Sequence, residues 1–390
     1  MRNNLLIYSE YHLSMMAGGE RWILEVTSRL KERYGWKIFI LTTTIGYNAE
    51  NLSKVRKVCR QYDIEYLSTN PLLPISSRIY ITPKLNVLKS YVKSCDVLYW
   101  LDGFPRPLSD IVLKSLILES RKPLIQGLHQ PLFIPKARRT SHVLHNIFNY
   151  IRPFNPLERK NWYHAINIDD YHILRSRGIK VFYVPNGVNT QLFTPLNDKF
   201  KFDNFTVLFI GSRWQKGVDF MPEIISKTLK KDKGVHFILI GGMAPSSALR
   251  FQLEKLEKRY PANISFKRHP CDEELRELYS KSHLFLFPSR YEGFGNVVLE
   301  AQSSGLPVLA FNIPGAPRDI ILNGITGSLV TPYDLDVMVK EIIKYHLLWE
   351  NNREAYHKIS LRARERAMEF DWNTIMTSLH SYFNEVLNQS

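Results

Sequence analysis

The 390-residue sequence has few cysteines and no long apolar run. Its three cysteines, Cys59, Cys95 and Cys271, lie far apart and form no C-x-x-C pair. This pattern argues against a disulfide framework or a zinc site and favours a reducing compartment. No apolar segment approaches the roughly 20 residues of a membrane-spanning helix, and the early run LLIY is too short for a signal-peptide core. We therefore expect a cytoplasmic protein, either soluble or peripheral on the inner face of a membrane.

Acidic residues are scarce relative to basic ones, with 37 Asp and Glu against 52 Lys and Arg and a net charge of +15. The excess indicates an anionic partner, either a nucleotide, a nucleic acid or an acidic membrane surface. A generally basic surface without function is the alternative. The hydrophobic fraction of 44% and the aromatic fraction of 12% are typical of a globular chain, which excludes a disordered one.

Short apolar runs alternate with longer segments of helical periodicity, such as Glu20–Tyr34. This alternation is typical of parallel strands that are buried on both faces and connected by helices. The chain is too long for a single core, and the runs form two series, roughly 1–185 and 205–330. We expect two doubly wound domains, with ligands at the carboxyl ends of their strands. The predicted strands are Asn4–Tyr8, Lys37–Thr42, Val97–Leu101, Pro123–Gly127, Val181–Val184, Thr206–Ile210, His236–Ile240, Leu284–Phe287 and Pro307–Ala310.

The domain boundary is expected within Val184–Asn204, where Pro, Asn and Gly residues interrupt any regular element and a polar stretch follows. The predicted domains are residues 1–190 and 191–370. Two helical patterns end the chain, Asp334–Phe370 and Trp372–Leu387. Residues 371–390 are expected to return to the N-terminal domain as a closing helix.

Two acids, Glu292 and Glu300, bracket a Gly-Phe-Gly turn in the segment PSRYEGFGNVVLEAQSSGLPVLAF. In one continuous helix they would lie about 12 Å apart, too far for a glycosidase pair at about 5 to 10 Å. The glycines instead place Glu292 in a loop and Glu300 inside a helix, whose first N–H groups offer an anion site. That order suits a ligand composed of a sugar, a diphosphate and a ribose. The alternative is a helix cap and a solvated acid.

The segment Pro288–Ala310 resembles the signature of retaining glycosyltransferases of family 4, P-S-x-x-E-G-F-G-x-x-x-L-E-A-x-x-x-G-x-P-V. Other stretches resemble the same family in order along the chain, namely MAGGERW, VPNGVNTQLFTP, FIGSRWQKGVDF, PGAPRDIILNGITGSLVTP and FDWNTIMTSLHSYFNEVL. The resemblance implies the GT-B fold, which has two Rossmann-like domains facing a central cleft. It implies that residues 1–190 bind the acceptor and residues 191–370 the nucleotide-sugar. It also implies that the C-terminal helix packs back on the N-terminal domain.

The resemblance implies a role for each matching residue of the C-terminal domain. Arg213 and Lys216 would neutralise the leaving diphosphate, although their spacing from Gly211 departs from the family pattern. Glu292 would bind hydroxyls of the donor sugar and Glu300 the ribose diol. Backbone contacts to the sugar and phosphate would come from Phe294, Gly295 and Asn296. No contact is assigned within Pro314–Asp319, where the chain departs from the family.

In the N-terminal domain, Gly18 and Gly19 would let backbone N–H groups approach the diphosphate from a loop before a helix. His129 follows a strand and resembles the family histidine that lines the reaction centre. Asp102 follows the preceding strand and is a candidate for acceptor contact. A structural role is the alternative for His129. His142 and His145 have i, i+3 spacing without a third ligand, which indicates an ordinary helix and no metal site.

The segment Phe133–Trp162 mixes basic residues with aromatic ones. Such a mixture suits an anionic membrane surface, and equally an ordinary helix pair with a basic outer face. A lipid-linked saccharide is therefore one expected acceptor. The basic residues are Lys136, Arg138, Arg139, Arg152, Arg159 and Lys160.

The resemblance implies transfer of a sugar, with retention, from a UDP- or GDP-linked donor to a glycan or a lipid-linked saccharide. The sequence shows no metal-ligand cluster, and cationic side chains can take the role of a metal, so we expect no obligatory metal or other cofactor. Three alternatives stay open. One is a catalytically silent GT-B protein that binds sugar nucleotide or glycan, and another is a sugar-nucleotide epimerase on the same fold. A nucleic-acid-binding protein is the third, but the sequence has neither a recognition-helix motif nor an aromatic RNA-binding signature. We therefore expect no nucleic-acid partner.

Overall fold

The computed structural model describes residues 3–76, 79–83, 85–102, 119–135, 140–151, 161–241, 246–268 and 270–389. The chain divides into two compact units. Unit 1 comprises Met1–Asn186 together with Ile375–Ser390, and unit 2 comprises Gly187–Thr374. The C-terminal helix thus begins in unit 2 and continues in unit 1.

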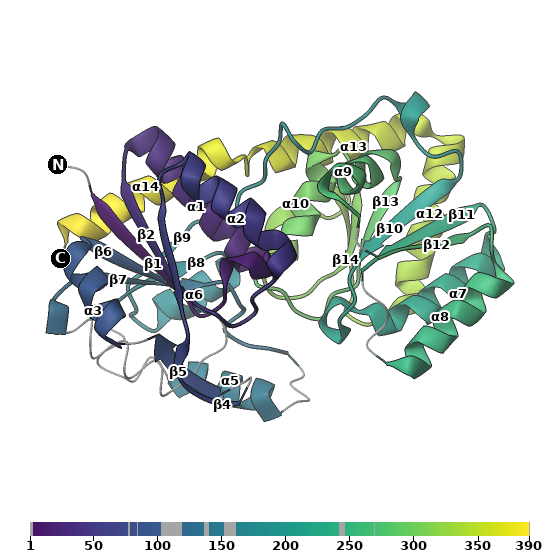
Figure 1. Cartoon of the computed structure of the whole chain (residues 1–390). Helices are drawn as coiled ribbons and strands as arrows, with labels where there is room; N and C mark the ends of the chain where they lie inside the picture. The colour runs from purple at the N-terminus through teal and green to yellow at the C-terminus, as the bar shows by residue number, and fades with distance from the viewer. Residues whose placement is uncertain are drawn as a thin grey trace. The chain divides into compact units, whose positions relative to one another are not determined.

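Unit 1 contains a seven-stranded sheet in the order β3-β2-β1-β6-β7-β8-β9, parallel at every pairing (Figure 1). Its strands are β1 (Asn4–Ser9), β2 (Lys37–Thr43), β3 (Glu65–Thr69), β6 (Val97–Asp102), β7 (Leu124–Leu128), β8 (Trp162–Ala165) and β9 (Val181–Tyr183). An antiparallel pair, β4 (Pro71–Ser76) and β5 (Ile79–Pro83), is separate from this sheet.

Helices cover both faces of the unit 1 sheet, and strand β6 shows how the two faces are filled. The Trp100 ring lies in a core cluster with residues of α3, whereas the neighbouring Tyr99 ring stacks on Trp22 of α1 and approaches Phe383 of α14. Helix α14 therefore packs on unit 1, as predicted. The helices of this unit are η1 (Leu13–Met15), α1 (Gly18–Tyr34), α2 (Ala49–Gln61), α3 (Leu85–Ser94), α5 (Thr140–Ile151), α6 (Ile168–Ser176) and α14 (Trp372–Asn388).

Unit 2 contains a six-stranded parallel sheet in the order β12-β11-β10-β13-β14-β15. Helices α7, α8 and α12 lie on one side of it, and α9, α10 and α13 gather on the other (Figure 1). The strands are β10 (Phe205–Ile210), β11 (Val235–Ile240), β12 (Ile264–Lys267), β13 (Leu284–Phe287), β14 (Val308–Phe311) and β15 (Gly327–Val330). The helices are η4 (Asp198–Phe200), η5 (Trp214–Lys216), η6 (Val218–Phe220), α7 (Met221–Lys231), α8 (Ser247–Arg259), α9 (Asp272–Lys281), α10 (Asn296–Ser303), α11 (Ala316–Ile320), α12 (Leu335–Asn351) and α13 (Arg353–Met368).

The sequence predicted two doubly wound domains, and both parallel sheets are present. All nine predicted strands form, with ends that differ by no more than one residue. The single helical pattern predicted over Asp334–Phe370 is wrong, because the segment forms two helices, α12 and α13. Asn352 separates them with φ −149° and ψ 69°, and its side chain accepts a hydrogen bond from Ala355 N at 3.1 Å to cap α13.

Candidate functional site

Two loops meet at the carboxyl edge of the unit 2 sheet. One follows β10 and carries η5 and η6, and the other follows the neighbouring strand β13. Lys216 Nζ of the first loop donates a hydrogen bond to Glu292 Oε1 of the second at 2.7 Å. The Glu292 residue is only 5% exposed, whereas the Lys216 side chain is 27% exposed. A buried carboxylate and a cation open to solvent are thus held together where a parallel sheet binds ligands.

Arg290 joins the same two loops, a role that the sequence did not reveal. Its guanidinium donates to both oxygens of Asp219, each at 2.7 Å, in a bidentate pair. The group also lies between the rings of Trp214 and Phe220, with its Cζ atom 4.1 and 4.0 Å from their centroids. The separation of 71 positions between Arg290 and Asp219 explains why no local spacing signals this pair.

Gly217 is required where the two loops come closest. Its φ of 76° lies in the left-handed region, and a Cβ atom there would lie 2.1 Å from the carbonyl oxygen of Pro288. A further cross-link runs from Gln215 Nε2 to the carbonyl oxygen of Tyr291 at 3.1 Å. The position of Lys216 beside Glu292 is therefore fixed by backbone packing as well as by charge.

Helix α10 begins at Asn296 with Gly295 as its N-cap, close to the predicted start. Glu300 lies on this helix, half-buried, and its Oε2 accepts a hydrogen bond from the Tyr279 hydroxyl at 2.8 Å. The Phe294 ring is buried 6.3 Å from the ring of Phe370, so its side chain belongs to the core of unit 2 and only its backbone is available to a ligand.

Arg213 is the N-cap residue of η5 and is exposed. Within the described part of the chain it has no ion-pair partner, unlike Lys216 and Arg290 of the same site. Its guanidinium is thus available to an anion.

In unit 1, Gly18 and Gly19 are the first two residues of α1, and the expectation of a loop before the helix is wrong. Gly18 is exposed. A Cβ at Gly19 would lie 2.9 Å from a methyl group of Leu101, which explains the small residue there. Burial raises the pKa of Glu20 in the same turn, while hydrogen bonds from its own and the Ala17 backbone N–H oppose that shift. This carboxyl group therefore accepts hydrogen bonds from backbone N–H groups at the helix start, where the resemblance predicts that a diphosphate binds.

His129 follows β7, as predicted, and belongs to a chain of hydrogen bonds. Its Nε2 lies 3.1 Å from the hydroxyl oxygen of Tyr99, which lies 2.8 Å from Nδ1 of His164. Nε2 of His164 lies 2.7 Å from the carbonyl oxygen of Val184. Burial lowers the pKa of His164 to about 4 and lowers the pKa of His129 well below its usual value. Both rings are therefore neutral near pH 7.

The direction of every hydrogen bond in this chain follows from its last member. The Val184 carbonyl only accepts, so His164 donates through Nε2 and its neutral ring accepts through Nδ1. The Tyr99 hydroxyl then donates to His164, and its oxygen accepts from Nε2 of His129. His129 is thus held as the Nε2–H tautomer, and its Nδ1 is a hydrogen-bond acceptor.

The residue at position 127 of strand β7 must be glycine for this chain to form. A Cβ atom on Gly127 would lie 1.9 Å from the Tyr99 hydroxyl oxygen. The ring of Trp22 also packs against His129 in a T-shaped contact, at 4.7 Å between centroids, and this contact restrains the imidazole. The sequence identified His129 but missed Tyr99, His164 and Gly127, because no short-range spacing connects them.

Several predicted residues lie wholly or partly outside the described residues. Asp102 is the last residue of β6, but its side chain is outside the described part of the structure. The six basic residues of 133–162 are also outside it. His142 and His145 lie on α5 and are buried, and Nε2 of His145 bonds the carbonyl oxygen of Pro131 at 2.8 Å, consistent with the ordinary helix predicted. No group of three or more metal-ligating side chains occurs among the residues that the structure describes.

Comparison with known proteins gives a family match for part of the chain. The family Glycosyl transferases group 1 matches residues 204–346, which make up most of unit 2. A probable sucrose-phosphate synthase from Thermosipho melanesiensis is 29% identical over 55% of this chain and 49% of its own length. One subunit of the human phosphatidylinositol N-acetylglucosaminyltransferase is 23% identical over 93% of this chain and 77% of its own length.

Solved structures match the whole chain in fold. A glycosyltransferase from Rickettsia africae superposes with a TM-score of 0.77 and 18% identity, covering 100% of both chains. Anabaena HepE in complex with UDP superposes with a TM-score of 0.73 and 17% identity, covering 99% of this chain and 100% of that one. The fold is therefore GT-B. The aligned region spans about half the length of the first two curated relatives, 49% and 54%.

Proposed function

We propose that the protein is a retaining glycosyltransferase of family 4 that moves a sugar from a UDP- or GDP-linked donor to a glycan or a lipid-linked saccharide. The observation that carries this proposal is the 2.7 Å ion pair between Lys216 and the buried Glu292 at the carboxyl edge of the unit 2 sheet. The group 1 match over residues 204–346 and the GT-B fold support it.

The donor would lie along this edge of unit 2. Lys216 and Arg213 neutralise the diphosphate, and Glu292 accepts hydrogen bonds from hydroxyls of the sugar. Glu300 holds the ribose diol, with the Tyr279 hydroxyl orienting its carboxylate at 2.8 Å. Backbone groups of Phe294, Gly295 and Asn296, at the positive end of α10, contact the sugar and phosphate.

In the reaction, the bond between the anomeric carbon and the phosphate oxygen breaks, and negative charge develops on the departing nucleoside diphosphate. Lys216 and Arg213 stabilise that charge, which lowers the barrier. The acceptor hydroxyl attacks from the same face, and its proton passes to the leaving phosphate, so configuration is retained. In unit 1, Gly18 and Gly19 present backbone N–H groups to the diphosphate. His129 lines the reaction centre, and Asp102 contacts the acceptor.

A lipid-linked acceptor is supported by helix α5. Four large apolar side chains on it are 42 to 62% exposed, at spacings of one, four and seven residues from the first: Val143, Leu144, Ile147 and Tyr150. Such a stripe is typical of a helix lying in a membrane interface. Among the described helices, none has the length and apolar character needed to cross a bilayer. We expect salt-sensitive flotation with anionic liposomes, and flotation that is absent or unchanged by salt would remove this part of the proposal.

Two measurements test the proposal as a whole. Thermal denaturation with a panel of UDP- and GDP-linked sugars should identify the donor, because a ligand that binds the native state raises its melting temperature. A donor-hydrolysis assay then separates an enzyme from a silent GT-B protein. Stabilisation by a sugar nucleotide without any turnover would support the silent alternative.

A further inference from the structure

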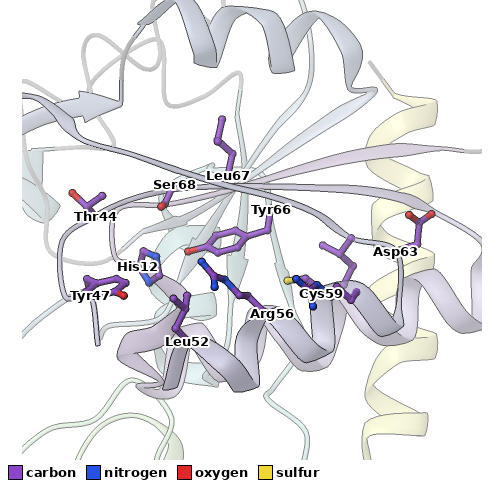
Figure 2. A pocket seen from close by; sticks show the side chains of 12 residues that line it. His12, Thr44, Tyr47, Leu52, Arg56, Cys59, Asp63, Tyr66, Leu67 and Ser68 are labelled. Carbon is purple, nitrogen blue, oxygen red and sulfur yellow. The ribbon is translucent and has the colours of Figure 1, made fainter. Parts of the chain in front are cut away.

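A pocket in unit 1 has no role in the proposed donor site. It has a volume of about 750 Å³ and lies between helix α2 and the edge strand β3. Figure 2 shows His12 and Tyr47 gathered at one end, with Arg56 reaching from α2 beneath the ring of Tyr66. Thr44, Arg60 and Ser68 also line the pocket. One end of it lies where β1, β2 and β3 end, because His12 and Thr44 follow β1 and β2 and Ser68 is near the end of β3.

His12 provides a hydrogen-bond donor to this pocket. The residue is 3% exposed, and its Nδ1 accepts the backbone N–H of Ser14 at 3.1 Å. The Ser14 hydroxyl accepts from Asn48 N at 2.8 Å and donates to the same Nδ1 at 2.7 Å. The neutral ring therefore carries its proton on Nε2. No described residue accepts a hydrogen bond from that Nε2, and His12 is among the residues that face the pocket.

The pocket also carries uncompensated positive charge. Arg56 and Arg60 lie one turn apart on α2, and neither has an ion-pair partner within the described part of the chain. The acid that lines the far end, Asp63, is paired with Lys31 at 2.9 Å, and this hydrogen bond lowers the pKa of Asp63. The local charge is thus that of two guanidinium groups.

The donors present match a tetrahedral oxyanion. Two guanidinium groups and one imidazole N–H supply several donors. The nearby Thr44 hydroxyl already donates to Asn70 Oδ1 at 3.0 Å, so the two arginines and His12 carry the recognition. The Tyr47 ring is 54% exposed and meets the His12 ring edge-on at 5.1 Å, which leaves an aromatic face beside the donors. A phosphate fits the charged part of the pocket, and a sugar or polyol ring fits against Tyr47.

We propose that this pocket binds a phosphate group carried by a sugar or polyol, and that the acceptor of the transfer reaction bears this group. The second clause rests on the proposed function, whereas the first does not. A free sugar phosphate and the head group of phosphatidylinositol both present a phosphate attached to a polyol ring, so the test distinguishes these two sources.

Binding is measured by calorimetry on the full chain without any nucleotide sugar. The probes are inorganic phosphate, glucose 6-phosphate, uncharged glucose, and phosphatidylcholine vesicles with and without phosphatidylinositol. We expect saturable binding of a phosphorylated probe and none of glucose. Preference for glucose 6-phosphate would indicate a soluble source, and preference for phosphatidylinositol vesicles a lipid source. Absence of saturable binding by all three phosphorylated probes would overturn the proposal.

The variants locate the binding. We expect the double substitution Arg56→Gln and Arg60→Gln to weaken binding by about tenfold or more, because two charged hydrogen-bonding groups are lost. Lys57→Gln removes the same charge from the same helix outside the pocket and should change affinity by less than about twofold. Equal losses in Lys57→Gln and the double variant would show general charge attraction and reject the pocket. If phosphate binds here but no sugar is transferred, the proposed function fails and the site stands.

Discussion

The two units hold their candidate site residues by opposite electrostatic means. In unit 2, two loops are joined by ion pairs, Lys216 with Glu292 and Arg290 with Asp219. In unit 1, His129 is held by neutral donors and acceptors, because burial lowers the pKa of both histidines of its chain. Paired charges suit a diphosphate, whose own charge is large. A neutral chain fixes which nitrogen accepts a hydrogen bond without adding charge, which suits a sugar hydroxyl.

Loss of the Lys216–Glu292 ion pair should have the largest effect on sugar transfer. We expect Lys216→Ala and Glu292→Ala each to reduce kcat/KM by about 100-fold or more, because stabilisation of the leaving group and positioning of the sugar are lost. Steady-state transfer assays measure the change. Lys227→Ala is the matched control, since Lys227 also bridges acids, Glu223 and Asp336, but lies on the exposed surface of α7. Near wild-type turnover in both site variants would exclude the proposed site.

Loss of the ion pair between Arg290 and Asp219 should have the second largest effect, on the local stability of the two loops. Arg290→Met leaves Asp219 without its bidentate partner and frees the two loops from each other. We expect a local cost of about 2 kcal/mol, below that of a fully buried pair because the Asp219 side chain is 35% exposed. Hydrogen exchange of residues 211–220 and 288–295 should accelerate by about tenfold or more. Arg250→Met on the exposed side of α8 is the control, and equal protection in both variants would contradict this role.

A buried histidine of unit 2 should make the protein sensitive to acid. Burial lowers the pKa of His283 from 6.5 to about 3, while Thr206 N donates to its Nδ1 at 3.0 Å. Between these values the unfolded chain binds the extra proton, so stability falls with falling pH by up to about 1.4 kcal/mol per pH unit. His283→Asn keeps an acceptor for Thr206 and should flatten the urea-unfolding profile between pH 6.5 and 4. Exposed His172→Asn should leave the slope unchanged, and an unaltered slope in His283→Asn would refute the assignment.

The neutral chain of unit 1 should give the smallest effect and the most specific one. Tyr99→Phe removes the hydroxyl that accepts from His129 Nε2, so we expect a mixture of both His129 tautomers in place of the Nε2–H form. Nitrogen-15 NMR of the imidazole distinguishes them. Transfer should fall by about fivefold, the effect of one hydrogen bond. Tyr171→Phe, whose hydroxyl lies on the surface of α6 beside Arg175, should alter neither measurement. An unchanged tautomer in Tyr99→Phe would disprove the chain.

The strands that the sequence predicted and those that it missed differ in composition and burial. The nine predicted strands are mostly apolar runs. Among the missed strands, β3 and β12 are sheet-edge strands with mostly half-buried or exposed residues, and the edge strand β15 begins with Gly and Ser in GSLV. β8 carries a histidine and a tyrosine in WYHA. Edge strands bury one face or less, so their composition is mixed and their periodicity weak.

The amino-acid sequence by itself determined the two parallel sheets, the loops that carry Lys216 and Glu292, and the start of α10 at Asn296, because apolar runs and turn-forming glycines act over a few residues. Only the tertiary structure decided which side chains meet. Lys216 contacts Glu292 across 76 residues, and Tyr99 contacts His164 across 65. The order of strands in each sheet makes these contacts, since it brings β10 beside β13 and β7 between β6 and β8. That order depends on packing over the whole unit, and no local stretch of sequence specifies it.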